Sequence, residues 1–502
     1  MQPVRNIAIV GGGTAGWIAA SMLARSLPGT GTHISVVESP DIGTVGVGEA
    51  TIPPIIDLLR YLSINEADFV KHTRATFKLG IKFHDWQRIG CSYWHPFGTF
   101  GAPVNRRPFF HAWQHVAAAG TALRIDDYSL CASLGDADKF RFPDPAAQTP
   151  AAGLRYALHF DAGLVARYLR AYAEKLGVSC LSRTVAEATR RADGGIDELI
   201  FTDGSRLAAE FYLDCSGFRG LLIEQTLRTG YVDWSDNLPC DRAVAVATEL
   251  SAPRTPYTQA SARAAGWRWR IPLQHRAGNG YVYASAHISD DKALEDLLRE
   301  VGEKPLSEPR YLRFLAGRRR LFWNRNVVAL GLASGFLEPL ESTSIHMIVS
   351  AVFKLLEYFP DRSFAPATID SYNSELIAET EAIRDFIILH FCLTQRDDTP
   401  FWTYCRTMKL PDSLAARIEL YRQSGRIRPG LRELFTDVSW FYIFDGLGLE
   451  PERHDPLIEV VPPEQLRGLL SSLSQSIRAL TQAAPTHDSY FAAADSAVAT
   501  MQ

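Results

Sequence analysis

Three glycines near the N-terminus have the spacing of a dinucleotide-binding loop. Gly11, Gly13 and Gly16 form GxGxxG, and Glu38 follows 22 residues after Gly16. In such a loop the first glycine permits a tight turn, the second lets the backbone approach a pyrophosphate, and the third lets the helix pack on the strand. The acidic residue binds the ribose, and amides at the helix N-terminus bind the phosphates. The pattern predicts a nucleotide site; the alternative is a glycine-rich turn without a ligand.

The elements around this loop support the nucleotide interpretation. Residues 6–10 form a short apolar run that predicts a buried strand, residues 17–27 have helical spacing, and residues 33–37 are a β-branched run ending at Glu38. Strand, glycine turn, helix and strand make one βαβ unit, which is the setting that the fingerprint requires.

The rest of the chain is of mixed type. Strands are predicted at 185–188, 198–202, 210–214 and 326–330, with a turn at Asp203-Gly204 between the second and third of these. Alternating segments in 243–287 indicate an antiparallel sheet. A helix is predicted at 345–358, and the chain is mostly helical from Pro366 onward. The tail after Ala483 is small and polar and carries no strong signal.

Composition narrows the class of protein. The 502 residues include 52 Lys plus Arg and 56 Asp plus Glu, a net charge of −4 without the basic stripe typical of nucleic-acid binding. No run approaches the roughly 18 apolar residues of a membrane span. The seven cysteines are widely spaced and form no CxxC pair, which argues against a disulfide framework or structural zinc and favours a reducing, cytoplasmic location.

Several segments together resemble the flavin-dependent halogenases of the tryptophan halogenase family. They are GGGTAGW (11–17), GVGEATIP (46–53), LDCSGFRG (213–220), WRWRIP (267–272) and GFLEPLEST (335–343). WxWxIP is the specific motif, because aromatic hydroxylases with the same flavin fold lack it. The resemblance implies an α/β fold: an FAD-binding Rossmann-like domain of the aromatic-hydroxylase type, an antiparallel sheet and a mainly helical C-terminal substrate-binding part. We expect a discontinuous core at 1–360, with substrate-lining insertions near 85–150 and 240–310, and a helical region at 361–502.

The resemblance also implies a reaction. FADH2, O2 and chloride or bromide give hypohalous acid, which travels through a tunnel to an aromatic substrate. A separate flavin reductase supplies the reduced flavin, since the chain has only one GxGxxG. The residues expected to bind FAD are Gly11, Gly13, Thr14, Ala15, Gly16, Glu38, Gly48, Glu49, Ala50, Val185, Gly331, Leu332 and Ile345.

Two residues are expected to be catalytic. Lys78, in the family's FKxG setting, would hold or carry the electrophilic halogen; by residue type alone it reads as a surface lysine, with Lys82 nearby as a decoy. Glu341 would stabilise the ring cation and accept its proton. Its alternative role is a helix-capping acid, and Glu338 competes for the assignment.

The halide is expected at Thr343 and Ser344, at the start of a helix, where free amides attract anions. The family's usual motif has glycine at the position of Ser344. Trp267 and Trp269 would lie on the same side of a strand, as a wall between substrate and flavin, or simply as core.

His95, Phe97 and Trp440 are expected to contact the substrate, with core packing as the alternative for His95 and Trp440. The tyrosine pair that holds free tryptophan in the family is not found here, which favours free indole or another small arene. A strict tryptophan halogenase, a flavin-dependent aromatic monooxygenase and a non-catalytic flavoprotein are the alternatives. The oligomeric state is open, a homodimer included.

Overall fold

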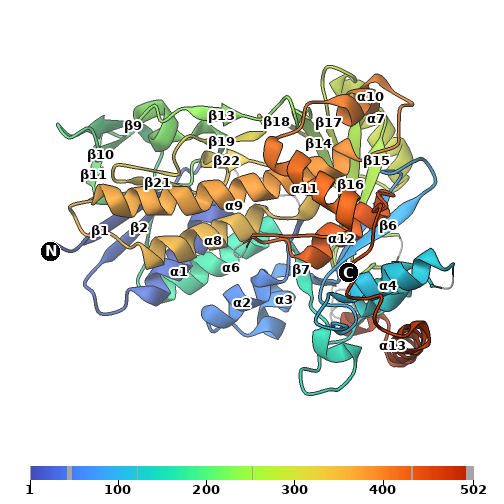
Figure 1. The fold of residues 1–502 in the computed structure, drawn as a ribbon. Helices are drawn as coiled ribbons and strands as arrows, with labels where there is room; N and C mark the ends of the chain where they lie inside the picture. The colour runs from blue at the N-terminus through green and yellow to red at the C-terminus, as the bar shows by residue number, and fades with distance from the viewer. Residues whose placement is uncertain (1, 42–47, 121, 252, 431–432, 493–502) are drawn as a thin grey trace. The chain divides into compact units, whose positions relative to one another are not determined.

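The computed structural model describes residues 2–41, 48–120, 122–251, 253–430 and 433–492 (Figure 1). The chain divides into two compact, discontinuous units. The first consists of Met1–Ala75, Phe160–Asp241 and Arg313–Glu381, and the second of Thr76–His159, Arg242–Leu312 and Ala382–Gln502. The long helix α9 (Pro366–Cys392) contributes residues to both.

A six-stranded sheet of order β20-β21-β12-β1-β2-β8 organises the first unit. Its strand β1 (Asn6–Val10) runs parallel to β2 (His33–Glu38) and to β12 (Phe211–Asp214). A strand inside a parallel sheet is covered on both faces and needs a continuous apolar run; accordingly, four of the five β1 residues are buried. Helix α1 (Thr14–Ser26) packs against α6 (Ala162–Lys175) and α8 (Ser344–Glu357), as Figure 1 shows. The predicted βαβ unit is confirmed.

The middle of the first unit differs from prediction at one strand. Residues Asp203-Gly204 do form a turn, but it joins β10 (Ile196–Phe201) to β11 (Arg206–Ala208), which the sequence did not indicate. Strand β11 has only three residues, and none of them is fully buried, so it has little apolar periodicity to detect. The other elements of this unit are β3 (Gly48–Ala50), α2 (Pro54–Tyr61), α3 (Glu66–Thr73), β8 (Ser179–Ser182), β9 (Val185–Arg190), β13 (Tyr231–Asp233), β19 (Gly317–Arg319), β20 (Trp323–Asn324), β21 (Val327–Ala329) and β22 (Gly335–Phe336).

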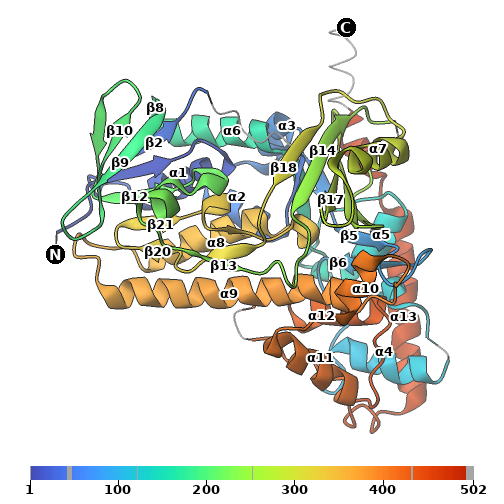
Figure 2. The same cartoon turned by 90° about the horizontal axis from the view of Figure 1, so that it is seen from above.

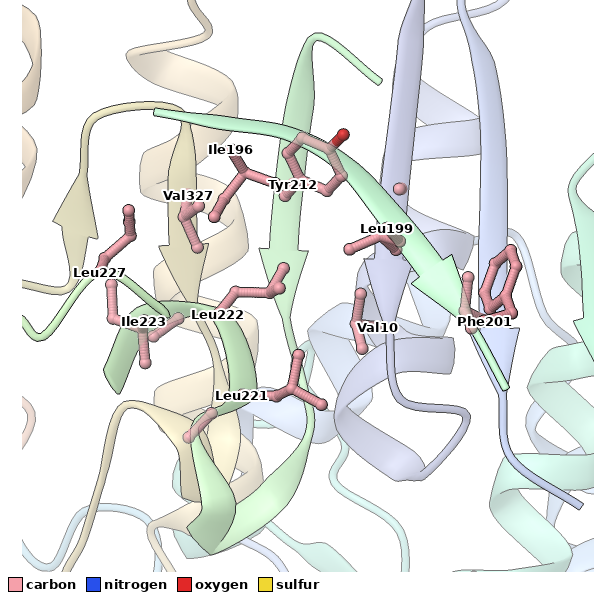
Figure 3. Close-up of a cluster of buried hydrophobic side chains, with 14 residues drawn as sticks. Val10, Ile196, Leu199, Phe201, Tyr212, Leu221, Leu222, Ile223, Leu227 and Val327 are labelled. Carbon is pink, nitrogen blue, oxygen red and sulfur yellow. The ribbon is translucent and has the colours of Figure 1, made fainter. Parts of the chain in front are cut away.

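A cluster of buried apolar side chains closes one face of the six-stranded sheet. In Figure 3 the π-helix η4 (Leu221–Thr226) and strand β10 direct Leu222 and Leu199 toward the sheet. Both carboxylate oxygens of Asp214, at the end of β12, accept backbone hydrogen bonds: Oδ2 from Leu222 and Ile223, and Oδ1 from Ser216. The LDCSGFRG segment therefore turns the chain at the end of β12, beside the glycine loop.

The second unit is built on a seven-stranded sheet of order β18-β14-β17-β16-β15-β5-β6. The predicted antiparallel segments of 243–287 are confirmed as β14 (Arg242–Thr248), β15 (Thr258–Arg263), β16 (Gly266–Pro272) and β17 (Ala277–Tyr283). Its other strands are β5 (Gly80–His84), parallel to β15, then β6 (Ser92–Pro96) and β18 (Arg310–Arg313). Outside this sheet, β4 (Thr76–Lys78) pairs antiparallel with β7 (Ala157–Asp161).

Helices of the second unit pack on this sheet and on one another. Figure 2 shows the long α13 (Pro463–Ala483) running beside α4 (Phe109–Ala118), and it also contacts α5 (Leu130–Asp136). The others are α7 (Asp290–Val301), α10 (Pro400–Thr407), α11 (Asp412–Ser424) and α12 (Asp437–Gly446), which confirms the mostly helical C-terminal part. None of the helices among the described residues is long and apolar enough to cross a membrane.

Candidate active site

The three glycines of the fingerprint have different environments. A Cβ on Gly11, whose φ is +120°, would lie 2.2 Å from the carbonyl oxygen of Cys215, and one on Gly16 would lie 1.9 Å from the carbonyl oxygen of Gly11. A Cβ on Gly13 would meet no described atom within 4 Å. Gly11 and Gly16 therefore serve tight packing, whereas Gly13 leaves open space at the start of α1, as a pyrophosphate requires.

Glu38 is held next to this loop. A Cβ on Gly12 would lie 2.6 Å from the Glu38 Cδ, and Arg170 of α6 donates from Nη1 to Glu38 Oε2 at 3.2 Å. The Arg170 guanidinium also lies 5.7 Å from the ring centroid of Trp17. The carboxylate thus has a fixed place at the end of β2, where a ribose hydroxyl can donate to it.

Other residues expected to bind FAD gather at the same end of the first unit. Gly331, with φ +60°, would place a Cβ 2.9 Å from that of Ala15, and it opens a short turn that includes Leu332. Thr14 is the first residue of α1. Ile345 lies buried in the first turn of α8. These residues fit a dinucleotide. The loop that would hold it is built so closely that a Cβ at Gly11, Gly16 or Gly331 would collide with a neighbouring atom.

The remaining residues of this set lie on two strands. Gly48, Glu49 and Ala50 form β3, and desolvation by burial raises the pKa of the Glu49 carboxyl to about 7. Val185 begins β9 and is half-buried against the apolar cluster of the sheet. Gly46 and Val47 of the GVGEATIP segment lie outside the described residues.

Glu341 and the start of α8 form the second part of the site. Glu341 ends a short 3-10 turn, η6 (Pro339–Glu341), with 1% of its surface exposed. The N-cap residue of α8 is Thr343, so Glu341 does not occupy the capping position considered as its alternative role.

The first amides of α8 are placed for an anion. The Thr343 side chain makes no capping hydrogen bond to the described chain, and the first turn contains no acidic residue. Free amides at a helix N-terminus favour negative charge. Ser344 is already helical, so this position does not need the positive φ that glycine permits; that conformation is at Ser342, with φ +59°.

Lys78 is buried in the second unit. It has no exposed surface, and its Nζ lies 5.2 Å from the ring centroid of Phe97. Lys82 is instead partly exposed and pairs with Asp136. The surface-lysine interpretation therefore describes Lys82 and not Lys78.

His95 and Trp440 belong to one aromatic cluster in the second unit. The His95 ring lies 5.5 Å from that of Phe386 and 5.9 Å from that of Phe435. Phe386 stacks on Phe435 with centroids 3.8 Å apart and meets Trp440 edge-to-face at 5.0 Å. Trp440 is fully buried, and its contact with substrate stays a prediction.

A charged pair covers Trp440. The Arg417 guanidinium lies 4.1 Å from its ring centroid, and two Arg417 nitrogens donate to the two Glu433 oxygens at 2.7 Å each. Stacking of a guanidinium on an indole is a favourable cation–π contact. Both charges of this pair are thus already engaged within the protein.

The WRWRIP segment is strand β16, and its alternation is as predicted. Trp267 and Trp269 are buried with ring centroids 6.1 Å apart. Arg268 and Arg270 are directed to the other face, where they pair with Glu300 and Glu303.

Sequence reasoning missed four residues near these sites: Phe386, Phe435, His159 and His487. The first two are apolar residues in the helical part of the chain, with nothing local to separate them from ordinary core. The histidines are single residues whose partners are distant in sequence.

Substitutions at Gly13, which faces open space, and at Gly16, which is tightly packed, should have different effects. Gly13→Val should leave the thermal midpoint near that of the wild type but weaken FAD binding at least about tenfold, or roughly 1.4 kcal/mol, because the side chain fills the phosphate space. Gly16→Ala should instead lower the thermal midpoint, because its Cβ meets the Gly11 carbonyl. Flavin fluorescence titration and thermal denaturation measure the two effects.

Gly468→Val is the matched control, since a Cβ there, on helix α13 of the second unit, would also meet no described atom within 4 Å. Wild-type FAD affinity in Gly13→Val would contradict the placement of the pyrophosphate.

Comparison with known proteins identifies the family. The tryptophan halogenase family model matches residues 6–463. The structure is similar to Xcc4156, a flavin-dependent halogenase from Xanthomonas campestris, with 43% identity, 98% of each chain covered and a TM-score of 0.93. It is also similar to BrvH, a flavin-dependent halogenase from Brevundimonas sp. BAL3, with 42% identity, coverage of 98% and 99%, and a TM-score of 0.94. Tryptophan 6-halogenase SttH from Streptomyces toxytricini is 34% identical over 97% of this chain and 98% of that protein. The chain belongs to the tryptophan halogenase family and is a flavin-dependent halogenase.

Proposed function

We propose that this enzyme halogenates an electron-rich, indole-type arene, with Lys78 and Glu341 as its catalytic residues. The observation that carries the proposal is the complete burial of Lys78 in the family's FKxG setting. Reduced FAD, when bound, supplies with O2 and a proton the two-electron oxidation of chloride or bromide to hypohalous acid, which leaves oxidised FAD and water. The protein's own residues bind the ions and deliver the halogen.

Lys78 acts on the hypohalous acid. Its Nζ either donates a hydrogen bond to the hypohalous oxygen, which polarises the oxygen–halogen bond, or takes the halogen and releases water. Phe97 lies over the same amine, so the end of the lysine is fixed beside an aromatic surface. The burial keeps bulk water from competing for the electrophile.

Glu341 acts on the arene. Attack of the ring on the halogen creates a cationic intermediate, and a nearby carboxylate stabilises this cation and accepts the proton that restores aromaticity. Thr343 and the first amides of α8, beginning at Ser344, hold the halide, because neither a capping side chain nor a first-turn acid neutralises that helix end.

The substrate proposal rests on the second unit. Glu433 is engaged by both Arg417 nitrogens, and Tyr442 is buried in α12. A tryptophan zwitterion buried in the site would need charged partners of its own, and the Glu433 carboxylate is already paired with Arg417. The engagement of Glu433 by Arg417 supports a small arene such as free indole.

We also propose that a separate flavin reductase supplies FADH2 by diffusion, since the sequence holds a single GxGxxG. All seven cysteines are free thiols, which supports a reducing, cytoplasmic environment.

Lys78→Met should retain FAD binding and oxygen consumption but lose nearly all halogenated product, because no amine delivers the halogen. Product is measured by mass spectrometry with indole, a flavin reductase, NADH and bromide. Lys82→Met, four residues along and partly exposed, is the matched control and should keep most of the activity. Wild-type product from Lys78→Met would refute the assignment.

Glu341→Gln should slow halogenation by about 10²–10⁴-fold, the range for loss of a positioned base. Glu338→Gln is a stringent control, because Glu338 is 2% exposed and Glu341 1% exposed, on the same segment. Single-turnover rates of halogenation with reduced flavin, measured for both variants, separate the effects of Glu341→Gln and Glu338→Gln. An equal loss in both variants would mean that the segment's structure, not the Glu341 carboxylate, is what matters.

Free indole should react faster than tryptophan, and at C3, its most nucleophilic carbon, because no anchor for the amino-acid backbone imposes another ring position. Bromide is expected to be used at least as well as chloride. Competition between indole and tryptophan, followed by chromatography and NMR of the products, measures this preference. Regiospecific chlorination of tryptophan on its benzene ring, with indole ignored, would overturn it.

A further inference from the structure

Strand β4, which carries Lys78, lies at an edge of its sheet. It pairs with β7 in the register Thr76 with His159, Phe77 with Leu158 and Lys78 with Ala157. In an antiparallel pair, alternate residues direct their amide and carbonyl away from the partner strand. The Phe77 amide is one of these, so it needs an acceptor from elsewhere in the fold.

The acceptor is His487, in the short helix η7 (His487–Tyr490) that follows α13. Its Nε2 lies 3.2 Å from the Phe77 amide nitrogen, and its Nδ1 lies 2.6 Å from the carbonyl oxygen of Arg254. An amide only donates and a carbonyl only accepts. His487 therefore carries its proton on Nδ1 and is neutral.

The neighbouring residue of β4, Thr76, is held by another buried histidine. The Thr76 hydroxyl donates to the Pro272 carbonyl at 2.6 Å, so its oxygen accepts from His159 Nδ1 at 3.3 Å. His159 Nε2 then accepts from the Thr258 hydroxyl at 2.9 Å. Pro272 ends the WRWRIP strand, so this chain of bonds joins that strand to β4.

Both imidazoles lie in surroundings that oppose their protonation. Burial lowers the pKa of His487 to about 4; the Arg254 carbonyl and Asp488 act against this shift, and the Arg254 charge adds to it. Burial, followed by the charges of Lys78 and His487, holds the pKa of His159 well below its usual range. The charged groups that face the pair are thus Lys78, Arg254 and Asp488.

Helix η7 is itself anchored. Arg254 Nη1 pairs with Asp488 at 3.0 Å, and the Tyr490 hydroxyl donates to the Phe140 carbonyl at 3.2 Å. Phe140 in turn stacks on Phe77, with centroids 4.2 Å apart. Residues 487–490 of the tail after Ala483, a tail that the sequence left without a role, are thus part of the support of β4.

We propose that His487 and His159 are positioning residues for Lys78, each acting as a neutral hydrogen-bond bridge to one of the two residues that precede it. The proposal rests on the proposed role of Lys78. Protonation of His487 places an N–H against the Phe77 amide and breaks the bridge. The contribution of His487 to the free energy of unfolding is therefore fully present above about pH 6.5, and it is lost as the pH falls toward about 4.

The test uses three variants of the full chain. His487→Leu removes both bonds; His487→Gln keeps a non-titrating acceptor for Phe77; Tyr490→Phe removes a different bond of the same helix and is the matched control. Hydrogen–deuterium exchange of peptides covering 76–80 reports on β4 directly. Thermal midpoints separate this local effect from general destabilisation.

We expect faster exchange of the β4 peptide in His487→Leu and a fall of about 10- to 100-fold in kcat for halogenation, the scale of a misplaced catalytic group. FAD affinity should not change. His487→Gln should recover much of both, and its thermal stability should decline less than that of the wild type between pH 6.5 and 4. Tyr490→Phe should behave as wild type in exchange and kcat.

Unchanged β4 exchange in His487→Leu, or equal effects in Tyr490→Phe, would overturn the proposal. If His487→Leu does not fold, the acid profile of His487→Gln decides: a decline identical to that of the wild type would contradict the bridge. A failure of the proposed function can be told apart from a failure of this proposal. If Lys78 is not catalytic, Lys78→Met will still form halogenated product, whatever the rate of hydrogen exchange in β4.

Discussion

The burial of the Lys78 amine is the constraint on which the second unit depends. Removing an ammonium group from water costs several kcal/mol, so such a side chain stays in place only where the surrounding fold fixes its backbone. Here the next residue, Leu79, donates to the Pro256 carbonyl at 2.7 Å and accepts from the Phe97 amide at 2.8 Å. Together with the pairing to β7, these bonds hold the strand on either side of the lysine.

The same local network brings an aromatic surface to the amine. The bond from Phe97 to Leu79 sets the end of β6, and this places the Phe97 ring over Nζ. Residue His95, one position before Pro96 on β6, belongs to the aromatic cluster of Phe386 and Phe435. Strand β6 and the residue that follows it thus bring the Phe97 ring to the Lys78 amine at the end of β4, and they join His95 to the aromatic cluster.

The first unit follows a different principle, the attraction of anions to helix N-termini. Helices α1 and α8 pack against each other, and neither has a capping side-chain bond or a first-turn acid within the described structure. By contrast, α3 is capped by Asn65 and α6 by Asp161. Leaving these two helix ends uncapped is consistent with one serving a pyrophosphate and the other a halide.

Local patterns predicted the first βαβ unit and the alternation along WRWRIP, because each depends on residues close in sequence. The burial of Lys78 could not be predicted in this way: its residue type indicates a surface, and only the pairing of distant strands encloses it. His487 bonds a residue 410 positions away and lies in a tail of small polar residues, so no spacing rule could reveal it. The short strand β11 was not predicted, because its three residues show no alternation of apolar and polar side chains.

We propose that the halogen reaches the arene inside the protein, through Lys78. The most direct test adds a scavenger of hypohalous acid, such as free methionine, to the wild-type enzyme turning over indole and bromide with a flavin reductase. The yield of bromoindole should barely change as the scavenger is raised well above the indole concentration. A yield that falls as steeply as it does when hypobromous acid is mixed with indole and scavenger without enzyme would contradict it.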